Sequence, residues 1–115
     1  MLTLYGIKNC DTVKKARQWL ETQDIEYRFH DFRKDGLDLS QLEHWEAELG
    51  WEALLNKRGT SWRKLEESQR EGVDRAKALV LMLAQPSLIK HPVLEAGTKT
   101  LIGFIPEEYS KELFE

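Results

Sequence analysis

The first third of the chain contains two kinds of hydrophobic pattern in a fixed order, and this order most constrains the fold. A short apolar segment, Leu2–Tyr5, ends at Gly6 and predicts a buried strand. From Asp11 to about Gln23, apolar residues recur every three or four positions, which predicts an amphipathic helix. Apolar and polar residues then alternate over Glu26–Phe32 and predict a second strand. Strand, helix and strand together predict a βαβ unit with two parallel strands.

The middle of the chain is expected to be helical. Ser40 is expected to cap one helix, and Ser61 is expected to cap a second helix over Trp62–Gln69. Asp74 is expected to open a third helix that runs through Ala84. The buried side of this third helix is predicted to carry Ala76, Leu79, Val80 and Leu83.

The last part of the chain returns to strand patterns. Val93–Glu95 and Thr100–Phe104 predict an antiparallel hairpin, and a final helix is expected to start at Pro106. We therefore predict an α/β protein with a thioredoxin-like layout, in which βαβ, a helical insertion and ββα build a mixed four-stranded sheet. Residues 1–115 are expected to form one domain, with the insertion at about 38–85.

Composition excludes several classes of protein. The 115 residues are 41% hydrophobic and carry a net charge of −3, which argues against a disordered chain and against direct binding of nucleic acid. No segment approaches the roughly 20 apolar residues that span a bilayer, and the N-terminal residues do not resemble a signal peptide. We expect a cytoplasmic monomer that does not associate with membranes.

Cys10 is the single cysteine, so it cannot form an internal disulfide. It is either a buried, inert thiol or a reactive one. It lies four residues after Gly6 and directly before the predicted helix, where unpaired backbone N–H groups favour the thiolate. Lys8 and Lys14 add positive charge nearby, while Asp11 opposes them. We expect a reactive thiol, whose oxidised form an external thiol must resolve.

Other polar residues have two interpretations each. Arg58 is either solvated or binds an anion, and His91 is either a surface residue or a proton donor beside the thiol. The histidines and Cys10 lack the short spacings of a metal site, so no metal is expected.

Four segments taken together resemble a known family: Tyr5–Ala16, Leu55–Ser61, Pro86–Val93 and Gly103–Phe104. They are similar to the arsenate reductase/Spx family, and within it to the YffB-like (Spx/MgsR) branch. The resemblance implies a thioredoxin-like fold with a helical insertion. It also implies that Cys10 is the nucleophile and that Pro92, after a cis peptide bond, lies beside it.

The chain departs from the two best-known activities of that family. Its arsenate reductases use three arginines, whose positions here fall on Asn56, on His91 and within Phe104–Pro106. An oxyanion would therefore lack bidentate partners. The Spx regulators typically carry a second cysteine three residues after the first, where this chain has Val13.

The first functional hypothesis is a glutathione-dependent thiol reductase with Cys10 as nucleophile. Glutathione would be a co-substrate, no cofactor would be tightly bound, and a glutaredoxin is a candidate partner. The alternative is an Spx-like regulator that binds RNA polymerase, and arsenate reduction comes third. The residues expected to bind substrate or glutathione are Lys8, Asn9, Asp11, Thr12, Arg58, Lys90, His91 and Pro92.

Overall fold

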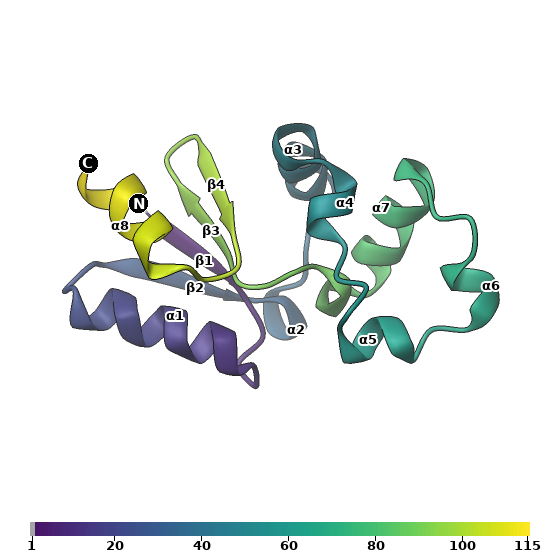
Figure 1. Ribbon diagram of the computed structural model, residues 1–115, viewed down its shortest axis with the longest axis horizontal. Helices are drawn as coiled ribbons and strands as arrows, with labels where there is room; N and C mark the ends of the chain where they lie inside the picture. Colours follow the sequence, from purple (N-terminus) through teal and green to yellow (C-terminus); the bar gives the residue numbers. More distant parts are fainter. Residues whose placement is uncertain (1) are drawn as a thin grey trace. The chain divides into compact units, whose positions relative to one another are not determined.

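The computed structural model describes residues 2–115, and four of its strands form one mixed sheet in the order β2-β1-β3-β4 (Figure 1). β1 runs parallel to β2 and antiparallel to β3, and β3 runs antiparallel to β4. This confirms the predicted mixed sheet of a βαβ unit and a hairpin. The strands are β1 (Leu2–Gly6), β2 (Tyr27–Asp31), β3 (Val93–Ala96) and β4 (Lys99–Ile102).

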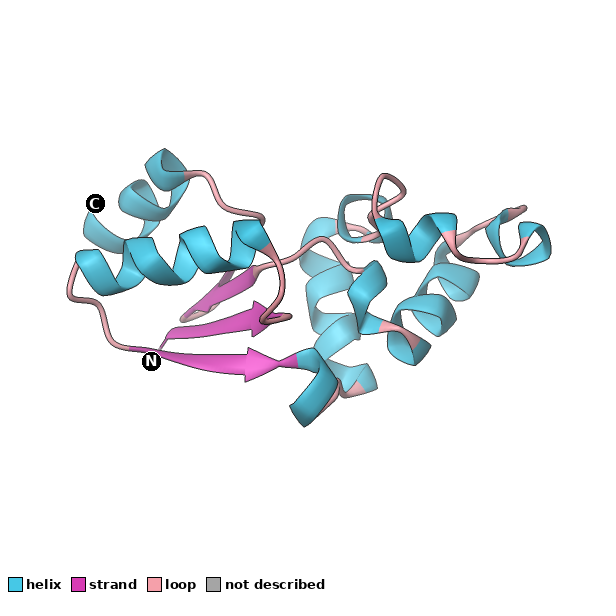
Figure 2. Ribbon diagram, turned by 90° about the horizontal axis from the view of Figure 1, so that it is seen from below, coloured by secondary structure: helices cyan, strands magenta, loops and turns pink. Residues whose placement is uncertain are grey.

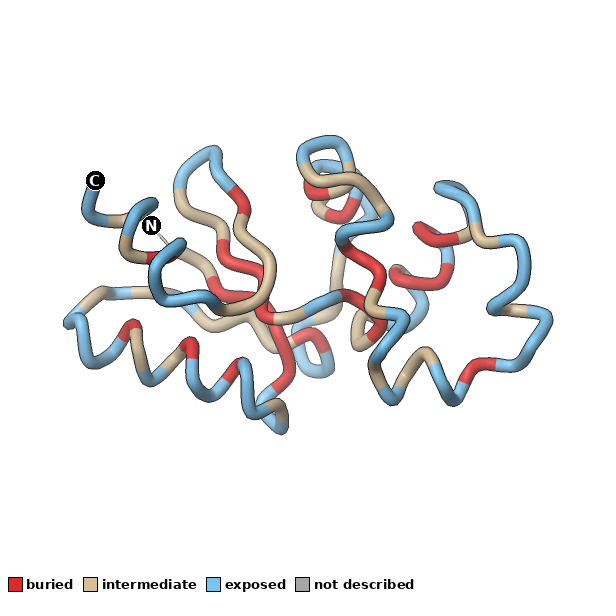
Figure 3. Tube along the Cα trace, viewed as in Figure 1, coloured by how far each residue is buried: buried red, intermediate tan, exposed pale blue. Residues whose placement is uncertain are grey.

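Two helices, α1 (Asp11–Thr22) and α8 (Pro106–Phe114), lie on the same face of this sheet (Figure 2). Leu4 on β1 is paired with Leu94 on β3, and both side chains are fully buried. Apolar residues of α1 meet them about once per turn, as the buried positions in Figure 3 show. The core cluster on this face consists of Leu4, Ala16, Leu20, Leu94 and Tyr109.

The hydroxyl of Tyr109 links α8 to the segment that precedes it in the chain. It donates a hydrogen bond of 2.8 Å to the Gly103 carbonyl, and its side chain is 1% exposed. Its ring packs edge-on against Trp19 of α1 and against Phe104, at centroid distances of 5.8 and 5.0 Å. Pro106 is the first residue of α8, as predicted.

The chain divides into two units. The sheet belongs to the first, which comprises residues 2–35 and His91–Glu115 and includes the short helix α2 (Phe32–Asp35). The second unit, Gly36–Lys90, consists of helices and contains the segment predicted as the insertion. Its elements are α3 (Leu39–Leu49), α4 (Trp51–Leu54), α5 (Thr60–Arg63), α6 (Glu67–Arg70), α7 (Arg75–Ala84) and the 3₁₀ turn η1 (Pro86–Leu88).

Two predicted helix starts in the second unit are wrong. α3 begins at Leu39 after Asp38, so Ser40 lies inside the helix rather than capping it. The single helix predicted over Trp62–Gln69 is two helices, α5 and α6. Ser61 lies inside α5 and donates its hydroxyl to Ser87, 2.7 Å away, instead of capping.

The break between α5 and α6 has a local cause. Glu66 adopts an extended conformation, φ −70° and ψ 154°, which ends helical geometry. It starts a new helix through a capping box, in which its backbone N–H donates to Oε1 of Gln69 at 3.0 Å.

The buried side of α7 also differs from the prediction. Asp74 caps this helix as expected, since its carboxylate accepts a hydrogen bond of 2.9 Å from the Lys77 N–H. Val80, however, is 67% exposed, and Ala76 is exposed as well. Because nearly every residue of α7 is apolar, periodicity alone cannot select one side. The residues actually buried are Ala78, Leu79, Leu81 and Met82.

The strand order, the βαβ connection and the terminal ββα segment define a thioredoxin-like α/β fold, as predicted. Among the described helices of residues 2–115, none is both long enough and apolar enough to cross a bilayer.

Candidate active site around Cys10

Cys10 lies at the junction between β1 and α1. Its backbone is extended, with φ −134° and ψ 124°, and its carbonyl accepts the first helical hydrogen bond from the Lys14 N–H at 2.9 Å. Cys10 is therefore the N-cap residue of α1, but its side chain makes no capping hydrogen bond. The residue is neither fully buried nor fully exposed, so it is not an inert core cysteine.

Gly6 determines how closely the end of β1 approaches α1. A Cβ atom at this position would lie 2.8 Å from Cγ2 of Val13, which is fully buried in α1. Real Cβ atoms essentially never approach another carbon so closely, so any larger residue would push strand and helix apart. Gly6 thereby positions the short connection that carries Cys10.

Four predicted binding residues flank the thiol in sequence, and all four are exposed. Lys8 and Asn9 form the turn before Cys10, whereas Asp11 and Thr12 begin α1. The N–H groups in the first turn of a helix have no intrahelical acceptor, and the helix dipole is positive there. The backbone at this position therefore stabilises an anion, including a thiolate.

Pro92 lies at the same end of the sheet as Cys10. β3 runs antiparallel to β1, and the register pairs Val93, its first residue, with Tyr5 near the end of β1. Pro92 precedes β3 directly, and its peptide bond with His91 is cis, the isomer that the family resemblance implies. Pro92 is buried and its carbonyl accepts a hydrogen bond of 2.8 Å from the Gly103 N–H, whereas His91 is half-buried.

Arg58 and Lys90 belong to the second unit, where they line a common cavity of about 400 Å³. Two backbone hydrogen bonds hold its walls together, from Asn56 N–H to the Leu88 carbonyl and from Lys90 N–H to the Leu54 carbonyl, at 2.8 and 2.7 Å. The cavity is lined by Glu52, Leu55, Asn56, Lys57, Arg58 and Lys90.

The sequence predicts only two of the three basic residues that line this cavity. Lys57 joins Arg58 and Lys90 there, and its Nζ lies 5.9 and 5.7 Å from the ring centroids of Trp51 and Trp62. Such cation–π contacts orient an ammonium group. Lys57 and Arg58 are adjacent in the sequence, and this pair already indicates a cationic loop. Nothing in the sequence indicates that Glu52 lines the same cavity. In the described part of the chain, no group of three or more His, Cys, Asp or Glu side chains is arranged to hold a metal ion.

The sheet and this thiol define the class of protein: a thioredoxin-like protein with one cysteine at the start of its first helix. The ArsC family model matches residues 5–112, and the chain belongs to that family.

Related proteins support the same assignment over nearly the whole chain. An uncharacterized protein of Haemophilus influenzae is 50% identical over 109 residues, which cover 95% of this chain and 96% of the relative. The solved structure of the YFFB (PA3664) protein is 53% identical, with a TM-score of 0.94 and coverage of 98% and 99% of the two chains. The global transcriptional regulator Spx of Listeria innocua is 24% identical over 115 residues, which cover 98% of this chain and 87% of Spx.

Proposed function

We propose that this protein is a glutathione-dependent thiol reductase in which Cys10 is the nucleophile. The observation that carries the proposal is the position of Cys10: a partly accessible thiol at the N-cap of a 12-residue helix, with a side chain that takes no part in capping. A cysteine in this position is available to attack an electrophilic sulfur.

The reaction requires two thiol–disulfide exchanges. In the first, the Cys10 thiolate attacks the glutathione sulfur of a mixed disulfide, forms a Cys10–glutathione disulfide and releases the substrate thiolate. In the second, the thiolate of a second glutathione attacks the glutathione sulfur of that adduct, which releases oxidised glutathione and regenerates the Cys10 thiolate. The substrate disulfide is reduced and two glutathione moieties are joined. Because no second cysteine exists in the chain, the external thiol is necessary.

The predicted binding residues have separate roles in this proposal. Backbone N–H groups at Asp11 and Thr12 stabilise the thiolate, and the chain around His91–Pro92 pairs with the peptide backbone of glutathione. Within the second unit, the cavity that contains Arg58 and Lys90 is suited to a carboxylate such as those of glutathione, because their side chains make no ion pair within the described residues.

Mass spectrometry of the intact protein after exposure to oxidised glutathione tests the proposal. We expect one glutathionyl group on the wild-type protein and none on Cys10→Ser. Arg58→Ala should weaken the binding of reduced glutathione about two- to fivefold through loss of one exposed charge contact. Arg70→Ala, an exposed arginine that does not line the cavity, is the matched control and should leave that binding unchanged. An unmodified wild-type protein would refute the proposal.

A second candidate function is favoured by the similarity to Spx along nearly the whole chain. An Spx-like regulator would act by binding RNA polymerase. A pull-down with the full chain distinguishes the two, because only the regulator retains stoichiometric polymerase subunits. Val13 stands where a second cysteine would be needed for a switch within the chain, so a polymerase contact here would not depend on an internal disulfide.

Arsenate reduction is the least supported activity. Asn56 and His91 replace two of the three arginines, and Phe104–Pro106 contains no third. We expect negligible arsenate turnover even with glutathione and glutaredoxin present. His91→Arg should increase arsenate binding, because it restores a bidentate donor directly before Pro92. Rapid turnover by the unmodified protein would instead favour an arsenate reductase.

A further inference from the structure

The cavity of the second unit brings together charges of both signs. Its cations are Lys57, Arg58 and Lys90, and Glu52 lines the same space. The volume of about 400 Å³ lies within the range of small-ligand sites. A carboxylate repels any anion that binds beside it, so Glu52 works against the binding of a simple anion. The presence of Glu52 therefore favours a ligand that carries a positive group as well.

Local contacts hold the loop that carries Arg58. The Arg58 N–H donates to Oδ1 of Asn56 at 3.1 Å, and the Arg58 carbonyl accepts a hydrogen bond of 3.2 Å from Nη2 of Arg63. Gly59 follows in close contact with Asn56, since a Cβ atom there would lie 2.8 Å from Nδ2 of that side chain. The side chains that line the cavity therefore start from a backbone that is held on both sides of Arg58.

None of the four charged side chains of the cavity is neutralised by an ion pair. Glu52, Lys57, Arg58 and Lys90 make no such pair with another residue in the described range 2–115. The Lys57 ammonium lies 5.9 and 5.7 Å from the ring centroids of two tryptophans, which already interact with it. Arg58, Lys90 and Glu52 are left to interact with a ligand.

These charges define the chemical group that fits the cavity. An α-amino-carboxylate carries an ammonium and a carboxylate on one carbon atom, so it presents both signs within a small space. Arg58 and Lys90 can pair with its carboxylate, Arg58 through two parallel N–H donors. Glu52 can pair with its ammonium. Glutathione carries this group only at its γ-glutamyl end, because its glycine end is a carboxylate alone.

We propose that this cavity binds the γ-glutamyl end of glutathione, with Arg58 and Lys90 at the α-carboxylate and Glu52 at the α-ammonium. Glu52 is then a specificity residue, which favours ligands with a free α-amino group and disfavours anions that lack one. Glutathione is the ligand because of the proposed function, on which this assignment rests. Recognition at this end needs no covalent step and no metal ion.

NMR titration of the full-length protein with S-methylglutathione tests the proposal, because the blocked sulfur cannot exchange with Cys10. The comparison ligand is N-glutaryl-S-methylcysteinylglycine, the same molecule without its α-amino group. We expect the wild-type protein to bind S-methylglutathione about two- to fivefold more tightly than the comparison ligand. The backbone amides of Arg58 and Lys90 should shift with both ligands.

Glu52→Gln should change the two affinities in opposite directions. It removes the partner of the ammonium, so S-methylglutathione should bind about two- to fivefold more weakly. It also removes a charge that repels the comparison ligand, which should bind more tightly, so the preference between the two ligands should disappear. Glu43→Gln is the matched control, since it makes the same charge change at an exposed position of α3 outside the cavity and should leave both Kd values unchanged.

Three outcomes would overturn the proposal. Equal affinity of the wild-type protein for the two ligands would show that the α-amino group is not recognised. Equal effects of Glu43→Gln and Glu52→Gln would show an unspecific effect of net charge. Shifts that leave out the amides of Arg58 and Lys90 would place the ligand elsewhere.

This proposal and the proposed thiol reductase fail separately. If Cys10 forms the glutathione adduct but the wild-type protein does not distinguish the two ligands, the reductase proposal stands and the role of Glu52 is refuted. If Glu52 determines the preference but no adduct forms, the cavity is a γ-glutamyl site in a protein that is not a reductase.

Discussion

The position of Cys10 depends on a close approach between the end of β1 and α1. Gly6 allows the end of β1 to approach Val13 in α1, and the segment between these two residues contains Cys10. The conformation of Gly6 is not the reason for glycine, since its φ is not in the left-handed region. Glycine is needed at position 6 because any Cβ there would enter the volume of the Val13 side chain.

Replacing Gly6 by alanine is therefore expected to destabilise the fold by about 1 to 3 kcal/mol, the usual cost of overpacking. The same change should slow alkylation of Cys10, because the connection before α1 would move. Urea unfolding followed by circular dichroism, together with the rate of iodoacetamide labelling, measures both effects.

A double-mutant cycle identifies the contact responsible. Val13→Ala removes the atoms that the new Cβ would meet, so Gly6→Ala should cost less in that background than in the wild type. Strictly additive losses of stability would disprove the proposed contact between positions 6 and 13.

At the scale of the elements, α3 and α7 both start after an aspartate, but only one of the two aspartates caps its helix with its side chain. Asp74 and Asp38 are both N-cap residues with extended backbones. Only the Asp74 carboxylate accepts a hydrogen bond from a backbone N–H of its helix, that of Lys77. The same residue type thus stabilises α7 directly but not α3.

This difference predicts unequal effects of two identical substitutions. Asp74→Ala should lower the free energy of unfolding by about 1 kcal/mol, because it leaves an N–H group of α7 without its acceptor. Asp38→Ala should have a clearly smaller effect. Thermal or urea unfolding of both variants measures the difference, and equal losses would contradict the assignment of the Asp74 cap.

At the scale of the whole molecule, stability depends on pH through buried tyrosine. Burial, with a smaller contribution from Glu108, raises the pKa of Tyr109 above its ordinary value of 10.0. Burial and the hydrogen bond to Glu21 also raise the pKa of Tyr27. The folded state therefore holds these protons more tightly than the unfolded chain does.

The sign of the pH effect follows from this difference. The stabilisation is fully present below pH 10 and should be lost progressively as the pH rises above the pKa of the unfolded chain. Tyr109→Phe should lower stability at pH 7 by about 0.5 to 1.5 kcal/mol, since the hydrogen bond to Gly103 is lost. The substitution should also reduce the loss of stability above pH 10, so that only the loss due to Tyr27 and other groups remains. Urea unfolding between pH 7 and 11 measures both, and identical pH profiles for the two proteins would refute the assignment to Tyr109.

The sequence alone determined the features that depend on neighbouring residues. The strand ending at Gly6, the cysteine before α1, the Asp74 cap and the proline at the start of α8 were all predicted. Each depends on a hydrophobic period or on a cap, which are properties of a short stretch of backbone. The position of Cys10 before the first helix is a property of this kind, so this part of the candidate site could be predicted.

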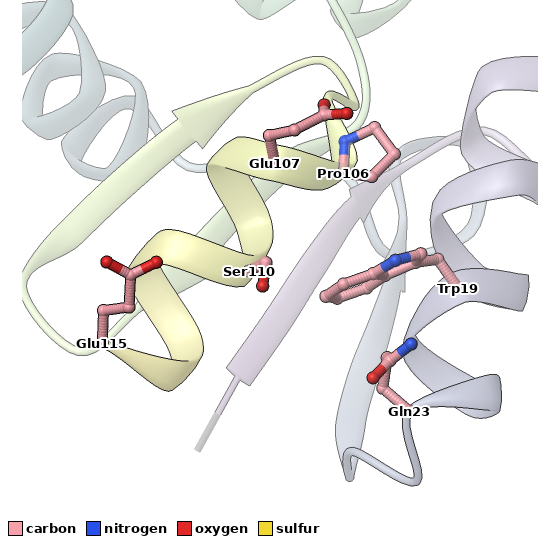
Figure 4. Close-up of a pocket in the computed structure, with 6 residues that line it drawn as sticks. All are labelled: Trp19, Gln23, Pro106, Glu107, Ser110 and Glu115. Carbon is pink, nitrogen blue, oxygen red and sulfur yellow. The ribbon is translucent and has the colours of Figure 1, made fainter.

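Only the tertiary structure decided which surfaces face the core and which residues share a cavity. In α7, Val80 is exposed although it was predicted to be buried, because an almost wholly apolar helix offers several equivalent sides and packing selects one. Likewise, Ser61 does not cap a helix but donates a hydrogen bond to Ser87, which lies 26 positions away in the sequence. The cavity lined by Trp19 and Ser110 (Figure 4) also requires folding, since its walls come together only when α1 and α8 pack on one face of the sheet. Contacts between distant residues depend on loop closure and packing, which no short stretch of sequence specifies.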